Sequence, residues 1–204
     1  MFPYYFFVTM LPTYTAEVLQ YPIRQNGALS ALPWLGFTVG SVASGYAADW
    51  LRDERGWSTA FVRKLMTGIA FCGLAVCLVL VSFLDHRQRA LAVALVVAGQ
   101  TLEGVQHAGY VINGMDIAPR FAGPLFAFTN TASCACGVLL PYVTSTVTEN
   151  GTPEQWRLVL WALAGILCVG AAIFTAFAEG EVQEWAIPRE DVGADSSEAE
   201  QTAM

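Results

Sequence analysis

The stretch FVRKLMTGIAFCGLAVCLVLVSFL, residues 61–84, decides the fold of this chain. Its charged residues lie near its start, and it continues without one from residue 65 to its end. An α-helix rises about 1.5 Å per residue, so about 20 apolar residues cross the roughly 30 Å hydrocarbon core of a bilayer. The stretch therefore predicts a membrane-spanning helix.

Five other stretches have the same character, and the connectors between them hold nearly all the charge. They cover residues 1–20, 28–50, 90–113, 121–147 and 157–178. A buried soluble core does not present six such lengths in succession. We therefore predict an all-α membrane protein with a bundle of six transmembrane helices in residues 1–178, and the lipid bilayer as its first partner.

The composition agrees with a membrane protein and places the acidity in a tail. Charged residues make up 13% of the chain, against roughly 25% in soluble domains. Eight of the 17 acidic residues but one of the 10 basic residues lie in 179–204, so residues 1–178 carry no net charge. We predict that residues 179–204 form an acidic cytoplasmic tail, disordered after about residue 188. We expect no nucleic-acid partner.

The basic residues near the helix ends favour cytoplasmic termini. With that orientation the inner connectors hold six of them, Arg52, Arg55, Arg63, Lys64, Arg120 and Arg189. The outer connectors hold four, Arg24, Arg87, Arg89 and Arg157. Cytoplasmic connectors carry the excess of Lys and Arg in membrane proteins. A small-residue stripe, Gly36, Gly40 and Ser44, also predicts close approach of a neighbouring helix.

Metal and enzyme chemistry find little support in the sequence. The five cysteines lie in apolar stretches, where they behave as small hydrophobic residues, and there are only two histidines. We expect no metal site and no cofactor. An intramembrane aspartyl enzyme would need paired aspartates, but Asp49 and Asp116 lie at helix ends in charged connectors. We therefore predict that the chain is not an enzyme.

The stretch 90–113 carries a polar face. On a continuous helix its strongly polar side chains fall within about 140° of one another. They are Gln100, Glu103, Gln106, His107, Tyr110 and Asn113. A carboxyl group in a membrane helix faces a cavity or a partner. Glu103 and His107, four residues apart, are expected to touch and to couple proton movement to substrate. The alternative is a structural pair between helices.

A second polar patch lies on the stretch 121–147. Thr129, Asn130 and Ser133 form it. The functional hypothesis is contact with substrate or sodium. The alternative is that these small polar side chains bond to their own or a neighbouring backbone, as they often do in membrane helices.

Several motifs in fixed order carry a resemblance to a known family. They are LPTY at 11–14, NGALSALP at 26–33, GYAAD at 45–49, DIAPR at 116–120 and GEVQ at 180–183. In this order the chain resembles the sialin, vesicular glutamate transporter and sodium–phosphate cotransporter family of the major facilitator superfamily. The resemblance extends to about residue 186.

The resemblance implies a fold of twelve helices, of which this chain looks like the C-terminal half, helices seven to twelve. It implies a missing N-terminal half, helices one to six, as a partner. The implied function is symport of organic anions, such as sialic acid-like sugars or acidic amino acids, coupled to protons, membrane potential or sodium. The implied location is a lysosomal, vesicular or plasma membrane. Alternatives are a sodium-dependent phosphate cotransporter and a truncated, non-transporting fragment.

The resemblance also implies a gating loop on the cytoplasmic side. It assigns that role to Gly45, Asp49, Arg52, Arg63 and Lys64. An acid at a helix end can pair with arginines in one conformation and release them in another. Asp116 and Arg120, at the next cytoplasmic turn, are counted with the gating residues and are also expected to cap the following helix. The chain departs from its relatives at Asn113-Gly114-Met115, where many of them have a histidine in second place.

Overall fold

A computed structural model describes residues 2–20 and 23–187 of the 204-residue chain. The part of the predicted tail from residue 188 onward lies outside these residues. The helices are α1 (Phe2–Glu17), α2 (Ile23–Asp53), α3 (Thr59–Val81), α4 (Arg89–Gly104), α5 (Tyr110–Ile117), α6 (Ala122–Val147) and α7 (Pro153–Phe177). Short 3₁₀ turns are η1 (His86–Gln88), η2 (Val105–Ala108), η3 (Pro119–Phe121) and η4 (Glu184–Ala186).

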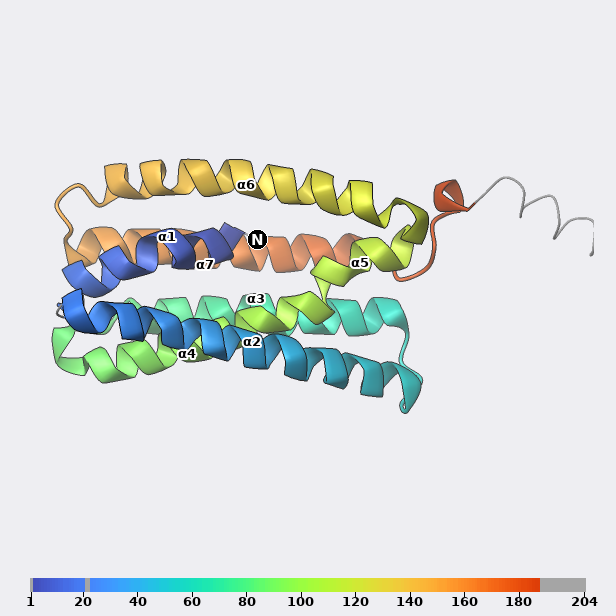
Figure 1. The fold of residues 1–204 in the computed structure, drawn as a ribbon, viewed down its shortest axis with the longest axis horizontal. Coiled ribbons are helices and arrows are strands. Elements are labelled where there is room, and N and C mark those ends of the chain that lie inside the picture. Colours follow the sequence, from blue (N-terminus) through green and yellow to red (C-terminus); the bar gives the residue numbers. More distant parts are fainter. Residues whose placement is uncertain (1, 21–22, 188–204) are drawn as a thin grey trace, which may run out of the picture.

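The helices lie side by side along one long axis and alternate in direction (Figure 1). One span consists of α4, η2 and α5 in sequence, and the others are single helices. The α2–α3 turn, the α5–α6 connection and the end of α7 meet at one end of the bundle. We call this the gate end, defined by residues 54–58, 118–121 and 178. The predicted six-helix, all-α architecture is confirmed.

Lipid is the solvent that suits the outer surface. Within the described residues, three helical stretches are long and apolar enough to span a membrane: Thr59–Val81, Pro119–Val147 and Pro153–Phe177. Their large side chains point outward in many places, among them Val76, Leu80 and Ile173, which are 58%, 47% and 56% exposed. Water would penalise this surface, whereas hydrocarbon does not.

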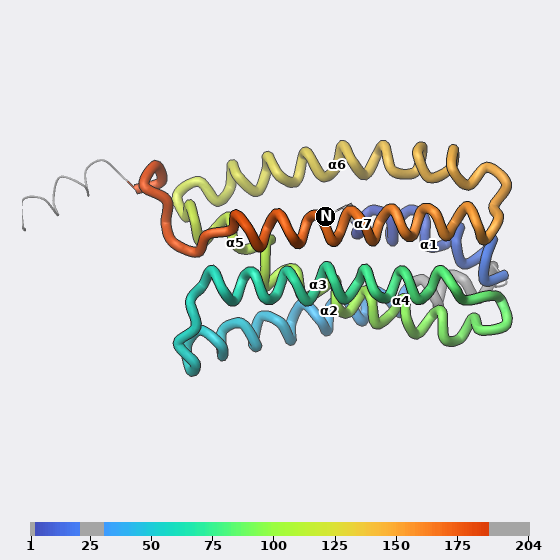
Figure 2. The backbone as a smooth tube through the Cα atoms, turned by 180° about the vertical axis from the view of Figure 1, so that it is seen from behind, coloured from blue at the N-terminus to red at the C-terminus, as the bar shows by residue number. Residues whose placement is uncertain are grey.

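The main hydrophobic core lies between α1, α3 and α7. Figure 2 shows α7 between α6 and α3, with α1 beside it. Trp156 at the start of α7 is 1% exposed and packs edge-on against Tyr14 of α1, with 5.4 Å between ring centroids. Leu74 and Leu163 bring α3 and α7 into the same cluster. These apolar contacts fix α1 to the bundle.

Glycines bring α2 and α4 into backbone contact. A Cβ atom on Gly104 would lie 2.8 Å from the backbone nitrogen of Ser41, and one on Gly36 would lie 3.0 Å from the carbonyl oxygen of Val97. Such distances leave no room for a side chain, so the helices meet as closely as the small-residue stripe predicts. The α2–α4 contact is the most extensive between helices in the described bundle.

Candidate transport site

The span predicted as one continuous helix over residues 90–113 is broken. It changes to a 3₁₀ turn at Val105–Ala108 and restarts as α5 after Gly109. A Cβ atom at Gly109 would lie 2.8 Å from the backbone nitrogen of Thr67, so α3 approaches the break where only glycine fits. The sequence prediction was wrong here because a tertiary contact, which the helical period does not reveal, sets the bend.

Amide and carboxyl groups gather just before the break, in the interior. Gln100, Glu103 and Gln106 are 0%, 1% and 3% exposed. Gln100 Nε2 donates a hydrogen bond to Glu103 Oε2 at 2.7 Å. The Oε1 atom of each of the three side chains has no hydrogen-bond partner within the described residues. Buried polar atoms normally have partners, so this cluster is polarised and incompletely satisfied.

His107 belongs to a different contact. Its Nδ1 lies 3.1 Å from Ser41 Oγ on α2, and its ring packs edge-on against Phe37 at 5.2 Å between centroids. In the described chain no hydrogen bond or ion pair joins it to Glu103. The expected Glu103–His107 contact was therefore wrong, because the 3₁₀ turn changes the angular offset that a regular helix gives to residues four apart. Sequence reasoning overlooked Ser41 as a partner.

Arg63 of α3 links the break to the gate end. Its Nε lies 2.6 Å from Asp116 Oδ2, its Nη2 lies 3.3 Å from Asp116 Oδ1, and its Nη1 donates to the Ala108 carbonyl at 2.9 Å. The Arg63 side chain is 3% exposed and that of Asp116 is 18% exposed. A two-pronged ion pair of this kind is strong and directional. Arg63 thus ties the end of the 3₁₀ turn to α5.

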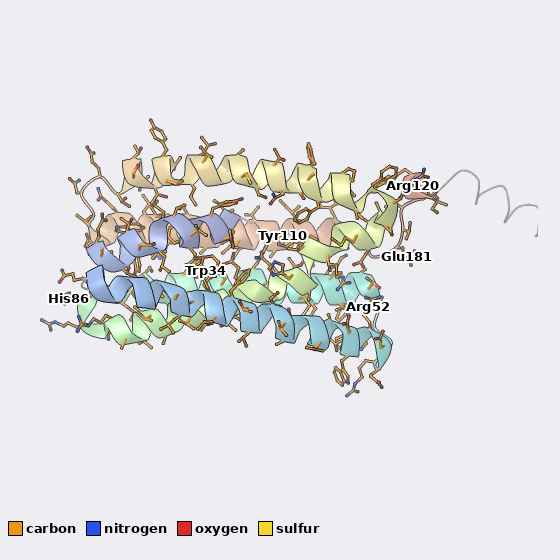
Figure 3. All side chains as sticks on the ribbon, viewed as in Figure 1. Trp34, Arg52, His86, Tyr110, Arg120 and Glu181 are labelled. Carbon is orange, nitrogen blue, oxygen red and sulfur yellow. The ribbon has the colours of Figure 1, made fainter. Side chains whose placement is uncertain are left out.

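The remaining gating-loop candidates do not join this ion pair. Asp49 is exposed, and no ion pair to it occurs in the described residues. Lys64 lines an outer groove beside Thr175 of α7, and Arg52 is half-buried. Gly45 has open space around its Cα. Figure 3 places Arg52, Arg120 and Glu181 at the gate end and His86 at the other end.

The expected capping role of Asp116 and Arg120 was wrong. Asp116 binds Arg63, and no side chain caps the 3₁₀ turn Pro119–Phe121 or α6 after it. The guanidinium of Arg120 instead lies 5.9 Å from the ring centre of Phe121. Asp116 pairs with Arg63 of α3 and does not cap α6, because a buried arginine needs a counter-ion.

A cavity of about 250 Å³ lies between α5 and α6. Tyr110, Asn113, Thr129 and Ser133 are its polar lining residues, so the structure brings four of the predicted polar residues together. Tyr110 lies near the middle of the long axis of the bundle (Figure 3) and is half-buried. Asn130 is half-buried and does not line the cavity.

Three of the cavity's polar groups already have backbone partners, among them Ser133, whose Oγ donates to the Thr129 carbonyl at 2.8 Å. Asn113 Nδ2 donates to the Glu179 carbonyl at 2.7 Å, which holds the segment after α7 against α5. Thr129 Oγ1 donates to carbonyl groups one turn earlier in α6. All three side chains keep an acceptor oxygen for a ligand.

These features define a class before any relative is considered: a helical membrane protein with buried ionisable and amide groups at an interrupted helix, the arrangement typical of transporters. The sequence profile of the Major Facilitator Superfamily matches residues 1–141. That is more than half of the chain, which therefore belongs to the Major Facilitator Superfamily, a superfamily of transporters and not of enzymes.

Several curated transporters are similar to the chain. Sialin of Homo sapiens is 40% identical over 184 residues, covering 90% of this chain and 37% of sialin. Vesicular glutamate transporter 1 of Xenopus laevis is 35% identical over 188 residues, 92% of this chain and 32% of its own length. A putative inorganic phosphate cotransporter of Drosophila melanogaster is 33% identical over 187 residues, which cover 90% of this chain and 35% of that protein. The chain thus spans about a third of each relative.

The resemblance predicted from the motifs is confirmed by these matches. The chain is an integral membrane protein of the Major Facilitator Superfamily.

Proposed function

We propose that the chain forms the C-terminal six-helix half of a secondary active transporter for organic anions, acting with an N-terminal half of six further helices. The substrates are acidic sugars of the sialic acid type or acidic amino acids. The energy comes from a proton or sodium gradient or from the membrane potential, in a lysosomal, vesicular or plasma membrane. The names of the similar proteins support this substrate range.

The observation that carries the proposal is the carboxyl group of Glu103 inside the bundle. It is 1% exposed and lies next to a helix break, close in sequence to Tyr110 at the α5–α6 cavity. A carboxyl group in the membrane interior costs several kcal/mol, so it persists where it performs a task. Interrupted helices carry the ion and substrate sites of many transporters.

The charges of the described residues support the need for a second half. Arg63 is the one buried basic side chain there, and Asp116 neutralises it. The α5–α6 cavity is lined by neutral side chains. An organic anion needs a positive partner in a low-dielectric site. In our proposal the N-terminal half supplies that partner, and this half supplies the amide and hydroxyl groups.

Uptake into proteoliposomes tests the proposal. The chain is reconstituted alone and together with the N-terminal half of the same transporter. Labelled sialic acid, glutamate and phosphate are offered under a proton gradient, a sodium gradient or a potassium diffusion potential. We expect gradient-driven uptake of sialic acid or glutamate with both halves and none with the chain alone.

The other outcomes decide between the alternatives. Uptake of phosphate alone, driven by sodium, would replace the organic-anion proposal by sodium–phosphate cotransport. Uptake equal to that of empty liposomes for all three substrates, with both halves correctly inserted, would mark a fragment that does not transport.

A further inference from the structure

Three side-chain oxygens on α4 and η2 lack donors. Gln100, Glu103 and Gln106 each have an Oε1 atom that is buried and has no hydrogen-bond partner within the described residues. They follow one another at intervals of three residues, so they lie on neighbouring positions of one helical face. Their side chains are between 0% and 3% exposed. A buried acceptor without a partner is destabilising, because it has lost its hydration without gaining a hydrogen bond.

A proton does not satisfy this group of oxygens. A proton on Glu103 would create one O–H donor, which serves one of the two amide oxygens and leaves the other unpaired. A bound cation accepts lone pairs from all three at once. The set contains one carboxylate and two neutral amides, so its single negative charge matches a monovalent cation better than a divalent one.

The surroundings offer no competing counter-ion in the described bundle. Arg63 is held by Asp116 and the Ala108 carbonyl, and His107 faces Ser41. The carbonyl oxygens of Leu102 and Gln106 at the helix break accept from the N–H groups of Val105 and Gly109, and each keeps a second lone pair for an ion. Sodium sites in transporters use such unwound segments.

We propose that Gln100, Glu103 and Gln106, with backbone carbonyls at the α4–η2 junction, bind one Na⁺ ion. Without the ion, the Gln100 amide donates to Glu103, as observed. With the ion, Gln100 Oε1, which has no partner in the observed arrangement, becomes a ligand, and Nε2 keeps its hydrogen bond to Glu103. This inference deepens the proposed transport function, since it names the coupling ion and its ligands.

Thermal unfolding of the purified 204-residue chain in detergent tests the site. Sodium chloride is titrated against choline chloride at constant ionic strength and pH 7.4. We expect a saturable rise in the melting temperature, about 3–6 °C at ten times the dissociation constant. Potassium chloride and calcium chloride serve as comparison titrations and are expected to give less than a third of the shift.

Variants locate the effect. We expect Glu103→Gln and Gln106→Leu to weaken Na⁺ binding at least tenfold. The matched control is Glu17→Gln, whose carboxylate accepts from Trp156 Nε1 at the far end of α1. It should keep the full shift. A Glu17→Gln chain that loses the shift, or a Glu103→Gln chain that keeps it, overturns the assignment.

The unmodified chain alone can also refute the site, so a variant that fails to fold does not remove the test. A melting temperature that changes with pH but not with sodium would overturn the site in favour of a proton. An equal shift with potassium or calcium would overturn the assignment to Na⁺. Sodium-dependent stabilisation without anion uptake in proteoliposomes would contradict the transport proposal and keep the site. Anion uptake without sodium-dependent stabilisation would contradict the sodium site and keep the transport proposal.

Discussion

Replacing Arg63 by methionine removes the guanidinium that holds the helix break to α5. The change leaves Asp116 without its partner at 2.6 Å and the Ala108 carbonyl without its donor at 2.9 Å. Removing one partner of a buried ion pair is destabilising by about 3–5 kcal/mol. Because Asp116 is 18% exposed and keeps some hydration, we expect the lower end of that range, about 3 kcal/mol.

A double-mutant cycle separates this ion pair from general packing. Unfolding free energies are measured in mixed detergent micelles for Arg63→Met, Asp116→Asn and the double variant. For a chain of this length, 3 kcal/mol corresponds to a fall in melting temperature of about 6–12 °C. We expect the double variant to be more stable than the sum of the single losses predicts, by about 2 kcal/mol.

Two results would refute this reasoning. One is an Arg63→Met chain within about 0.5 kcal/mol of the unmodified chain, which is the range of an ordinary surface substitution. The other is strict additivity in the cycle, which would mean that the two side chains do not interact. Arg63→Lys is a useful intermediate, since one ammonium group does not reproduce the planar fork.

Three further predictions follow from the close helix contacts and from the segment after α7. Gly109→Ala should destabilise the chain by about 1–3 kcal/mol in the same unfolding assay, because its Cβ would lie 2.8 Å from the Thr67 backbone nitrogen. Gly104→Ala should lower the melting temperature, while the control Gly114→Ala, with open space around it, should not; equal effects would contradict the α2–α4 contact. Asn113→Ala removes the donor to the Glu179 carbonyl. It should speed proteolytic cleavage after residue 179, whereas unchanged cleavage would mean that other contacts hold this segment.

The sequence predicted the fold well because the membrane imposes a simple length rule. A stretch such as residues 61–84 is apolar for nearly its whole length, so few alternatives to a spanning helix exist. The small-residue stripe around Gly40 likewise indicated a tight helix contact, since glycine removes the only obstacle to backbone approach. Both signals come from residues close together in the sequence, so they can be recognised without knowing which helices pack against each other.

The candidate site was less predictable because its geometry depends on contacts between distant residues. Glu103 and Gln100 were recognised as members of one polar face, which requires only helical periodicity. The partner of His107 was missed, since Ser41 lies 66 positions away and the helix between Glu103 and Tyr110 is not regular. A glycine at residue 109, beside the polar cluster, was the one signal that could have indicated the break.

The measurement that tests the account most directly is gradient-driven anion uptake by the Glu103→Gln transporter, assembled from this chain and its N-terminal half. The Glu17→Gln transporter is the matched control, with insertion of both verified. The account predicts that Glu103→Gln loses at least nine-tenths of the gradient-driven uptake, as an order-of-magnitude expectation for loss of one coupling charge, while Glu17→Gln retains it. Undiminished uptake by Glu103→Gln, with the same dependence on pH and sodium, would contradict the assignment of the α4–η2 cluster to ion coupling.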